Sequence, residues 1–307
     1  MKKSYQGQHK NAKSLNNKTK TKALIVVLVL ILIIIVLSII PLSLWIVQPS
    51  LFFGPLHDKE SYNKLHQIDD FKEIKININN RLIDGWFYHN SKDDSKKPKP
   101  LVIYYGGNMQ NSSKTCLNYY NSSIFEFFDN YNFLMVDYPE FGLSDGRLTQ
   151  KTMFENAISV YDYASNLDYV DANNIVIMGY SIGSGIANYV ASSRNVSGLI
   201  ILAPYDELRS LYNEHLNIFY GPIRKIIRYD FKSYEYAKNI KVAPLVFTSY
   251  DDEVISYKYT DNLISYYDDI YYYKILDNDV KHNDYIFQKE VLLKIEEYLQ
   301  DMIKEDG

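Results

Sequence analysis

Residues 175–190 read Ile-Val-Ile-Met-Gly-Tyr-Ser-Ile-Gly-Ser-Gly-Ile-Ala-Asn-Tyr-Val: an apolar run, a Gly-x-Ser-x-Gly turn and a run of small residues. This order predicts a short buried strand, a sharp turn that exposes the hydroxyl of Ser181, and a helix whose N-terminus faces that serine. Gly179 and Gly183 flank the serine because a side chain at either position would collide with the neighbouring strand or helix. The stretch therefore predicts a nucleophile elbow.

The rest of the body supplies the strands and helices that an elbow needs. Two alternating segments, 71–78 and 81–89, flank Asn79-Asn80 and predict a β-hairpin, and the polar residues 91–100 predict a surface loop. Further strands are expected at 101–105, 132–137, 174–178, 198–203, 244–250 and 271–276, and helices at 112–129, 150–166, 182–193, 256–267 and 284–303. Short apolar strands that alternate with helices predict an α/β fold, with a mainly parallel central sheet flanked by helices.

One long interval between predicted strands, 204–243, has no obvious strand and is rich in tyrosine and phenylalanine. Such a segment can be a short cap that shapes an acyl-binding pocket over the serine. It can equally be an ordinary crossover helix with extra surface tyrosines, because the chain has 30 tyrosines in all. Both interpretations stay open.

The N-terminal residues differ sharply from the body. Residues 1–22 contain seven lysines and no acidic residue, and their asparagine, serine and glutamine content predicts a disordered basic tail. Residues 23–47 are almost entirely apolar and would extend about 37 Å as a helix, enough to cross a bilayer. A cleaved signal peptide would need a shorter apolar core of about 7–15 residues and a small-residue cleavage site, and neither is evident. We therefore expect one N-terminal transmembrane helix, a connector over 48–70, and a folded domain over 71–307.

The charge distribution bears on orientation and on partners. Lysines on the N-terminal side of the apolar run place the tail in the cytoplasm and the folded domain outside the cell membrane, as a single-pass protein. Without those seven lysines, 26 basic residues face 37 acidic ones, a net charge of −11. So acidic a body argues against nucleic-acid binding, which requires a basic face. Cys116 is the only cysteine, so the chain has no intramolecular disulfide.

A serine hydroxyl is a weak nucleophile and needs a general base that a third group orients. In proteins with a nucleophile elbow the acid and then the histidine follow the serine along the chain. Only His215 and His282 follow Ser181. His215 falls inside 204–243, whereas His282 comes just after the last predicted strand, which makes it the expected base. The acid is expected after strand 244–250, where three carboxylates stand in a row: Asp251, Asp252 and Glu253.

A fourth element follows the predicted strand 101–105. Gly106-Gly107-Asn108-Met109 lies where a loop would come beside the nucleophile. The backbone N–H groups of Asn108 and of Ile182 are the expected oxyanion-hole donors for a carbonyl oxygen that gains negative charge. The alternative is a glycine turn that the backbone geometry alone requires.

Four motifs in this order resemble the membrane-anchored, short-cap α/β-hydrolase-domain proteins of the serine hydrolase superfamily, from about residue 50 to the C-terminus. The matching motifs are Gly106-Gly107-Asn108-Met109, Val136-Asp137-Tyr138-Pro139-Glu140-Phe141-Gly142-Leu143-Ser144-Asp145-Gly146, Asp251-Asp252-Glu253-Val254-Ile255 and Lys281-His282-Asn283-Asp284. In that family the aspartate directly before Glu-Val-Ile is catalytic, so the resemblance implies Asp252. It also implies the α/β-hydrolase fold.

The chain departs from the family pattern at four positions. Tyr105 stands where many relatives have histidine, and Glu140 stands where they have glycine. Lys281 replaces the glycine before the histidine, and Tyr250 replaces a residue that is usually small or polar. None of these changes removes Ser181, Asp252 or His282, although an ammonium close to His282 would lower its basicity.

These features predict a membrane-anchored serine hydrolase that cleaves carboxylic esters or related acyl bonds through an acyl-enzyme. A serine peptidase or amidase is an alternative, because the same residues cleave amides. A non-catalytic, membrane-anchored binding protein on the same fold is another. We expect no cofactor and no metal, since no His/Cys cluster has ligand spacing. The expected partners are a small-molecule, lipid or peptide acyl substrate and the membrane; the oligomeric state is not predicted.

Overall fold

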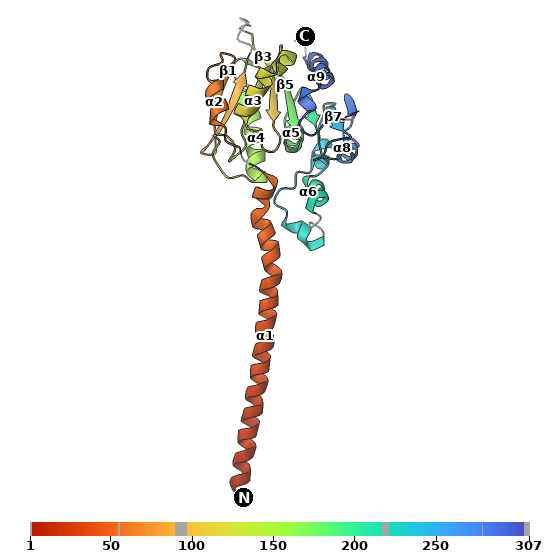
Figure 1. Cartoon of the computed structure of the whole chain (residues 1–307). Helices are drawn as coiled ribbons and strands as arrows, with labels where there is room; N and C mark the ends of the chain where they lie inside the picture. The colour runs from red at the N-terminus through yellow and green to blue at the C-terminus, as the bar shows by residue number, and fades with distance from the viewer. Residues whose placement is uncertain (1, 55, 90–96, 217–220, 278, 304–307) are drawn as a thin grey trace. The chain divides into compact units, whose positions relative to one another are not determined.

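The computed structural model describes residues 2–54, 56–89, 97–216, 221–277 and 279–303 (Figure 1). The chain divides into two compact units, one ending at Gln48 and the other beginning at Pro49. The surface loop predicted over 91–100 falls mostly outside the described residues.

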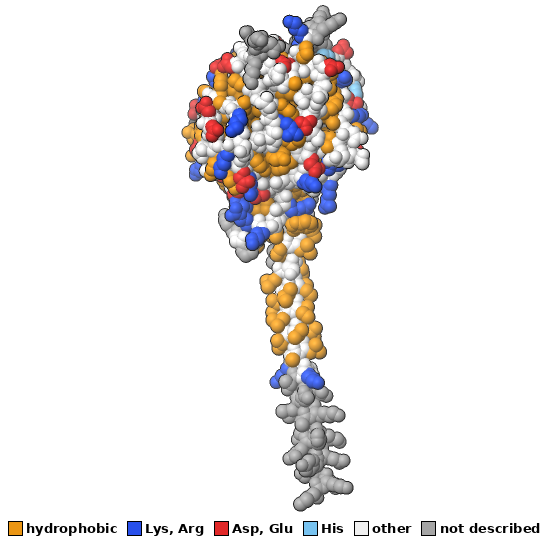
Figure 2. All heavy atoms as spheres, turned by 180° about the vertical axis from the view of Figure 1, so that it is seen from behind, with side chains coloured by type: hydrophobic (Ala, Val, Ile, Leu, Met, Phe, Trp, Pro, Cys, Tyr) orange, Lys and Arg blue, Asp and Glu red, His pale blue; other side chains and the backbone are white. Residues whose placement is uncertain are grey.

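The first unit consists of helix α1 (Lys2–Phe52), which continues a few residues past its boundary. Its stretch Lys20–Ser50 has 31 residues and is long and apolar enough to cross a membrane, although a signal sequence passes the same test. Figure 2 shows apolar side chains along this part of the helix. The helix also continues through residues 2–22, where composition predicts a disordered tail. That segment lacks proline and is rich in lysine, which has a favourable helix propensity.

The second unit is built on one sheet. Among the described residues eight strands are ordered β1-β2-β4-β3-β5-β6-β7-β8. β1 pairs with β2 and β2 with β4 in antiparallel register, and all other neighbours are parallel. The strands are β1 (Phe71–Ile78), β2 (Arg81–Tyr88), β3 (Lys99–Tyr105), β4 (Asn132–Val136), β5 (Val170–Tyr180), β6 (Gly198–Leu202), β7 (Leu245–Ser249) and β8 (Tyr272–Leu276). The predicted hairpin and mainly parallel sheet are therefore confirmed.

Helices cover both faces of this sheet and create two apolar cores. Successive residues of β3 alternate between them: Ile103 lies in one core and Val102 in the other. The first core is closed by α4 (Gln150–Ala164), α5 (Ile182–Ser193) and α8 (Tyr257–Ile264). The second is closed by α2 (Lys59–Leu65), α3 (Ser112–Asn121) and α9 (Lys289–Met302). Burial on both faces explains why the central strands read as continuous apolar runs.

Two of the predicted helices are wrong in extent. The helix expected over 112–129 ends at Asn121, because Ser123 adopts a left-handed backbone (φ 55°) before the 3₁₀ helix η1 (Ile124–Phe128). The helix expected over 284–303 is likewise interrupted. A short 3₁₀ helix, η3 (Tyr285–Phe287), comes first, and extended Gln288 separates it from α9.

The segments expected to be a connector and a cap both contain helices. Residues 48–70 include α2, and Phe53 just after α1 is buried in the first core. Within 204–243 the described residues form α6 (Leu208–Leu216), the 3₁₀ helix η2 (Gly221–Ile226) and α7 (Ser233–Ala237), with no strand. Whether this segment shapes a substrate pocket stays a prediction.

Candidate active site

Ser181 occupies a strained turn between β5 and α5. Its backbone has φ 54° and ψ −124°, a conformation that L-residues rarely adopt. A Cβ at Gly183 would lie 2.0 Å from the carbonyl oxygen of Tyr105, and one at Gly179 would lie 2.6 Å from that of Gly183. Only glycine fits at these two positions, so the elbow predicted from the sequence is present in the backbone.

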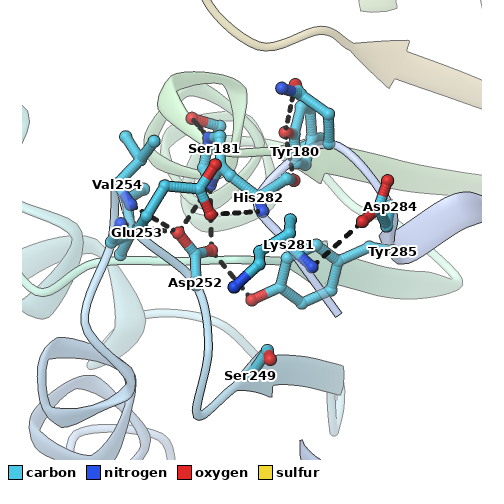
Figure 3. Close-up of polar contacts among 12 residues, drawn as sticks. Tyr180, Ser181, Ser249, Asp252, Glu253, Val254, Lys281, His282, Asp284 and Tyr285 are labelled. Atoms are coloured by element: carbon cyan, nitrogen blue, oxygen red, sulfur yellow. Dashed lines mark hydrogen bonds and ion pairs between the residues drawn. The ribbon is translucent and has the colours of Figure 1, made fainter. Parts of the chain in front are cut away.

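His282 reaches the serine from the loop after β8. Its Nε2 lies 2.9 Å from Oγ of Ser181, and both side chains are buried (Figure 3). The hydroxyl of Tyr180 donates to the carbonyl oxygen of His282, and the carboxylate of Glu253 accepts from its backbone N–H. The histidine is therefore held by its backbone on both sides and directed at Ser181.

Asp252 completes this chain of hydrogen bonds from the loop after β7. Nδ1 of His282 lies 2.8 Å from Oδ2 and 3.0 Å from Oδ1 of the carboxylate. Oδ1 also accepts the backbone N–H groups of Val254 and Ile255 at 2.9 and 2.8 Å. Burial alone would raise the pKa of Asp252. The hydrogen bonds from His282, its charge, and the two backbone N–H groups together outweigh burial and hold the pKa below its ordinary value. The carboxylate is thus ionised and fixed in place.

The other two carboxylates of the acid loop, Asp251 and Glu253, bind backbone N–H groups and not the imidazole. Oδ2 of Asp251 accepts the backbone N–H of Asp279 at 2.8 Å, which joins the two loops. Glu253 accepts the backbone N–H of His282. Of the three acids that the residue pattern left open, Asp252 is the one at the imidazole.

Two tyrosines at the site were not predicted. The hydroxyl of Tyr285, in η3, donates to Oδ2 of Asp252 at 2.9 Å, and Tyr180, before the nucleophile, holds the backbone of His282. Tyr285 stands three residues after His282, a spacing that carries no recognised motif. Only the fold of the histidine loop brings its hydroxyl to the aspartate.

The loop after β3 lies against the elbow. A Cβ on Gly107 would lie 3.3 Å from Cβ of Ser181, and the N–H of Gly107 is already bound to Oε1 of Gln110. Within the described residues, the backbone N–H groups of Asn108 and Ile182 donate to no protein acceptor. Those two predicted donors therefore remain available to a ligand.

The departures from the family pattern find local explanations. Tyr105 is buried, and its hydroxyl donates to the carbonyl oxygen of Ala157, away from the serine. Glu140 adopts φ 71°, a left-handed conformation that glycine reaches without strain, which explains why relatives have glycine there. Its carboxylate accepts the backbone N–H of Leu148. The side chains of Lys281 and Tyr250 are exposed.

A cavity of about 330 Å³ opens beside the site, on the α3 side of Tyr180. Its wall combines hydroxyl and amide groups with aromatic rings, among them Tyr104, Tyr119, Gln110, Asn118 and Phe287. Met109 of the Asn108 loop and Asn283 of the histidine loop also line it. The space is large enough for part of a small organic substrate next to the hydrogen-bonded chain.

Two further sequence expectations concern His215 and metals. His215 lies in α6, and the position of its side chain is outside the described part of the chain. The residues that the structure describes contain no group of three or more histidine, cysteine or acidic side chains arranged to hold a metal ion. Cys116 is buried in α3 as a free thiol.

Solved structures with the same architecture are esterases and other hydrolases. Est1E from Butyrivibrio proteoclasticus, solved with ferulic acid, matches with a TM-score of 0.61 and 18% identity over 76% of this chain and all of its own. The Pyrococcus furiosus esterase Pf2001 matches with a TM-score of 0.64 and 15% identity, over 82% of this chain and 98% of its own. An acetyl xylan esterase from Paenibacillus sp. R4 matches with a TM-score of 0.58 and 14% identity, over 84% of this chain and 99% of its own.

Similarity to curated proteins is weaker. A multifunctional-autoprocessing repeats-in-toxin protein of Vibrio cholerae is 23% identical over 181 residues, which is 52% of this chain but 4% of the toxin. An uncharacterized protein of Mycobacterium tuberculosis is 22% identical over 132 residues, 43% of this chain and 46% of that protein. The chain thus spans less than half the length of these relatives, and no protein-family model matches it. The solved structures show that residues from Pro49 onward have the α/β-hydrolase fold.

Proposed function

We propose that this protein is a serine hydrolase that cleaves carboxylic esters or related acyl bonds through an acyl-enzyme. The observation that supports it most is the hydrogen-bonded chain from Oγ of Ser181 through His282 to Asp252. Its spacing is that of a nucleophile, a base and an orienting acid. The esterase folds of the structural neighbours agree with this proposal.

In the proposed reaction Ser181 attacks the acyl carbonyl while Nε2 of His282 takes the hydroxyl proton. The carbonyl oxygen gains negative charge and receives hydrogen bonds from the free N–H groups of Ile182 and Asn108. Asp252 stabilises the imidazolium, which then protonates the leaving alcohol. A water molecule then gives a proton to the same histidine and adds to the acyl-enzyme. The resulting tetrahedral intermediate collapses, which releases the acid and returns the proton to Ser181.

We further propose that the substrate carries an apolar group and that the enzyme is anchored in the cell membrane by residues 23–47, with its N-terminus in the cytoplasm. Large apolar side chains are exposed beyond the carboxyl ends of four parallel strands, at the edge of the sheet where Ser181 follows β5: Met109, Leu143, Val254 and Phe287. Exposed apolar side chains at the same edge of the sheet as the proposed nucleophile favour a substrate with an apolar acyl or alcohol group. Small-molecule and lipid esters both meet this requirement.

The test uses the full chain in detergent with Ser181→Ala as the matched variant. Wild type should hydrolyse p-nitrophenyl esters and be labelled covalently by a fluorophosphonate, and Ser181→Ala should do neither. Labelling that persists in Ser181→Ala would exclude this serine as the nucleophile. A wild type that is folded but not labelled would instead favour a binding protein. Matched ester and anilide substrates in the same assay separate an esterase from an amidase.

A further inference from the structure

Four residues just after α1 run across the loops of the site: Phe53, Gly54, Leu56 and His57, which we call the strap. The backbone N–H of Gly54 donates to Oδ1 of Asn108 at 2.9 Å. Because Asn108 is the proposed oxyanion donor of its loop, the strap binds the side chain of the same residue whose backbone N–H stays free.

The strap is itself fixed by contacts that do not involve Asn108. The ring of Phe53 is buried and packs edge-on against Tyr229, with centroids 4.7 Å apart. The carbonyl oxygen of Leu56 accepts from Nδ2 of Asn111 at 3.0 Å and from the backbone N–H of Gly142 at 3.0 Å. Nδ1 of His57 lies 2.5 Å from the carbonyl oxygen of Gly142. The strap is thus an anchored support to which the loop attaches.

The loop needs such a support. Met109, next to Asn108, has φ 62°, a left-handed conformation that is unfavourable for a residue with a Cβ. Its side chain lies over the strap, since a Cβ on Gly54 would be 2.7 Å from Cγ of Met109. A loop with a strained residue keeps one conformation only where its surroundings impose it. Gln110 closes the loop from inside through the N–H of Gly107. Gly54 contributes the hydrogen bond to the side chain of Asn108 and the contact with Met109.

We propose that the strap positions the oxyanion hole. Gly54 holds the side chain of Asn108, and this directs the backbone N–H of Asn108 at the carbonyl oxygen of the substrate. Asn108 is then an oxyanion donor through its backbone N–H, and its side chain is where the strap influences the rate of the reaction. This inference rests on the proposed hydrolase function.

The first experiment replaces the acceptor and keeps the donor. Asn108→Ala in the full chain removes Oδ1 but retains the backbone N–H. Loss of a whole oxyanion donor costs about 10²–10³ in kcat, so a misdirected donor should cost about tenfold or more, with little change in KM. The matched control is Asn173→Ala, an exposed asparagine near the opposite end of β5, which should leave kcat unchanged.

The second experiment tests the strap side without touching Asn108. Gly54→Ala keeps the backbone N–H but places a methyl group against Cγ of Met109. In a Met109→Ala background that Cγ is absent, so the same methyl group has no such clash. We expect Gly54→Ala to lower kcat about fivefold or more with Met109 present and less than about twofold in the Met109→Ala background, which a double-mutant cycle measures.

The outcomes separate this inference from the proposed function. If wild type is labelled by the fluorophosphonate but Asn108→Ala and Gly54→Ala keep kcat within about twofold of the control, the strap does not position the hole and the inference fails. If wild type is neither labelled nor active, the hydrolase proposal itself fails. If Asn108→Ala does not fold, the Gly54 and Met109 cycle alone decides, since equal effects of Gly54→Ala in both backgrounds contradict the inference.

Discussion

The hydroxyl of Tyr285 lies 2.9 Å from Oδ2 of Asp252, the oxygen that Nδ1 of His282 also approaches to 2.8 Å. With the N–H groups of Val254 and Ile255 on Oδ1, the buried carboxylate has donors on both oxygens. A carboxylate bound in this way cannot rotate without breaking several hydrogen bonds. Tyr285, three positions after the imidazole, therefore helps to hold the carboxylate that orients it.

Tyr285→Phe should weaken this arrangement without destroying it. Loss of one hydrogen bond to a charged group is worth about 1.5–3 kcal/mol, part of which will appear as a decrease in kcat of about three- to tenfold. Steady-state kinetics measure it. Tyr271→Phe is the control, because that hydroxyl also binds carboxylates, but they are those of Asp301 and Glu297 on α9 and not of a site residue. A Tyr285→Phe enzyme as fast as the control would show that the other donors suffice.

Asp252→Asn should lower kcat by about 10³–10⁴-fold, because an amide favours the wrong tautomer of His282 and cannot stabilise its cation. The neighbouring Asp251→Asn provides the matched comparison. Asn at 251 retains an acceptor for the N–H of Asp279, so its activity should stay within a few-fold of wild type. Equal losses in both variants would contradict the assignment of Asp252.

Gly183→Ala should destabilise the fold and remove hydrolysis together. The new methyl would lie 2.0 Å from the carbonyl oxygen of Tyr105, and backbone atoms on both sides leave it no room. We expect a loss of about 3 kcal/mol or more in the free energy of unfolding, measured by urea. Gly221→Ala is the comparison: nothing lies within 4 Å of its added methyl, and its φ of 52° alone should cost about 1 kcal/mol.

Asp84 predicts a pH dependence of stability. It is buried on β2 beside the carboxylate of Glu73. Burial, together with Glu73 and Asp137, raises its pKa from 3.8 to about 7. Folding therefore favours the protonated form, so this group's contribution to stability is fully present below about pH 4, falls as the pH rises to about 7, and is then lost.

Asp84→Asn should reduce this fall. The difference in Tm between variant and wild type should increase from pH 5 to pH 8 by about 4 °C or more, measured by thermal unfolding in detergent. Asp129→Asn, an exposed aspartate, should show no such increase. A difference in Tm that is the same at both pH values would mean that Asp84 does not titrate in this range.

The proposed anchor is tested by charge. Arginine at Ile33 and at Val36 should each oppose insertion by about 3 kcal/mol, so the double variant should leave the membrane fraction on alkaline washing while wild type remains. Leu293→Arg, on the exposed face of α9, should have no effect. The prediction fails if wild type is itself extracted, or if a protease added outside intact cells spares the body while cutting an exposed control.

Patterns of short range predicted the fold well. The hairpin over 71–78 and 81–89 follows from Asn79-Asn80, both of which adopt positive φ, as a tight turn requires. Helix ends were less predictable. The break at Ser123 depends on one residue in a left-handed conformation, and propensity does not distinguish it from a continuing helix.

The candidate site shows the same division. Chain order and loop position indicated Ser181 and His282, and the structure brings them together. Side-chain reach decided the rest. Three adjacent acids are equivalent in a pattern, but only Asp252 extends to the imidazole, while Asp251 turns to Asp279. Tyr285 and the strap carry no sequence signal, since each acts through a contact that exists only after the chain has folded.

If the body is anchored at a cell surface as proposed, the strap also bears on its release. A protease that cuts before Phe53 would shed a body that retains every contact to Asn108, and the shed protein should stay active. A cut after His57 would remove those contacts, and we expect the shed body to be slower. A difference of five residues in the cleavage position would thus decide whether the released body is fully active or slow.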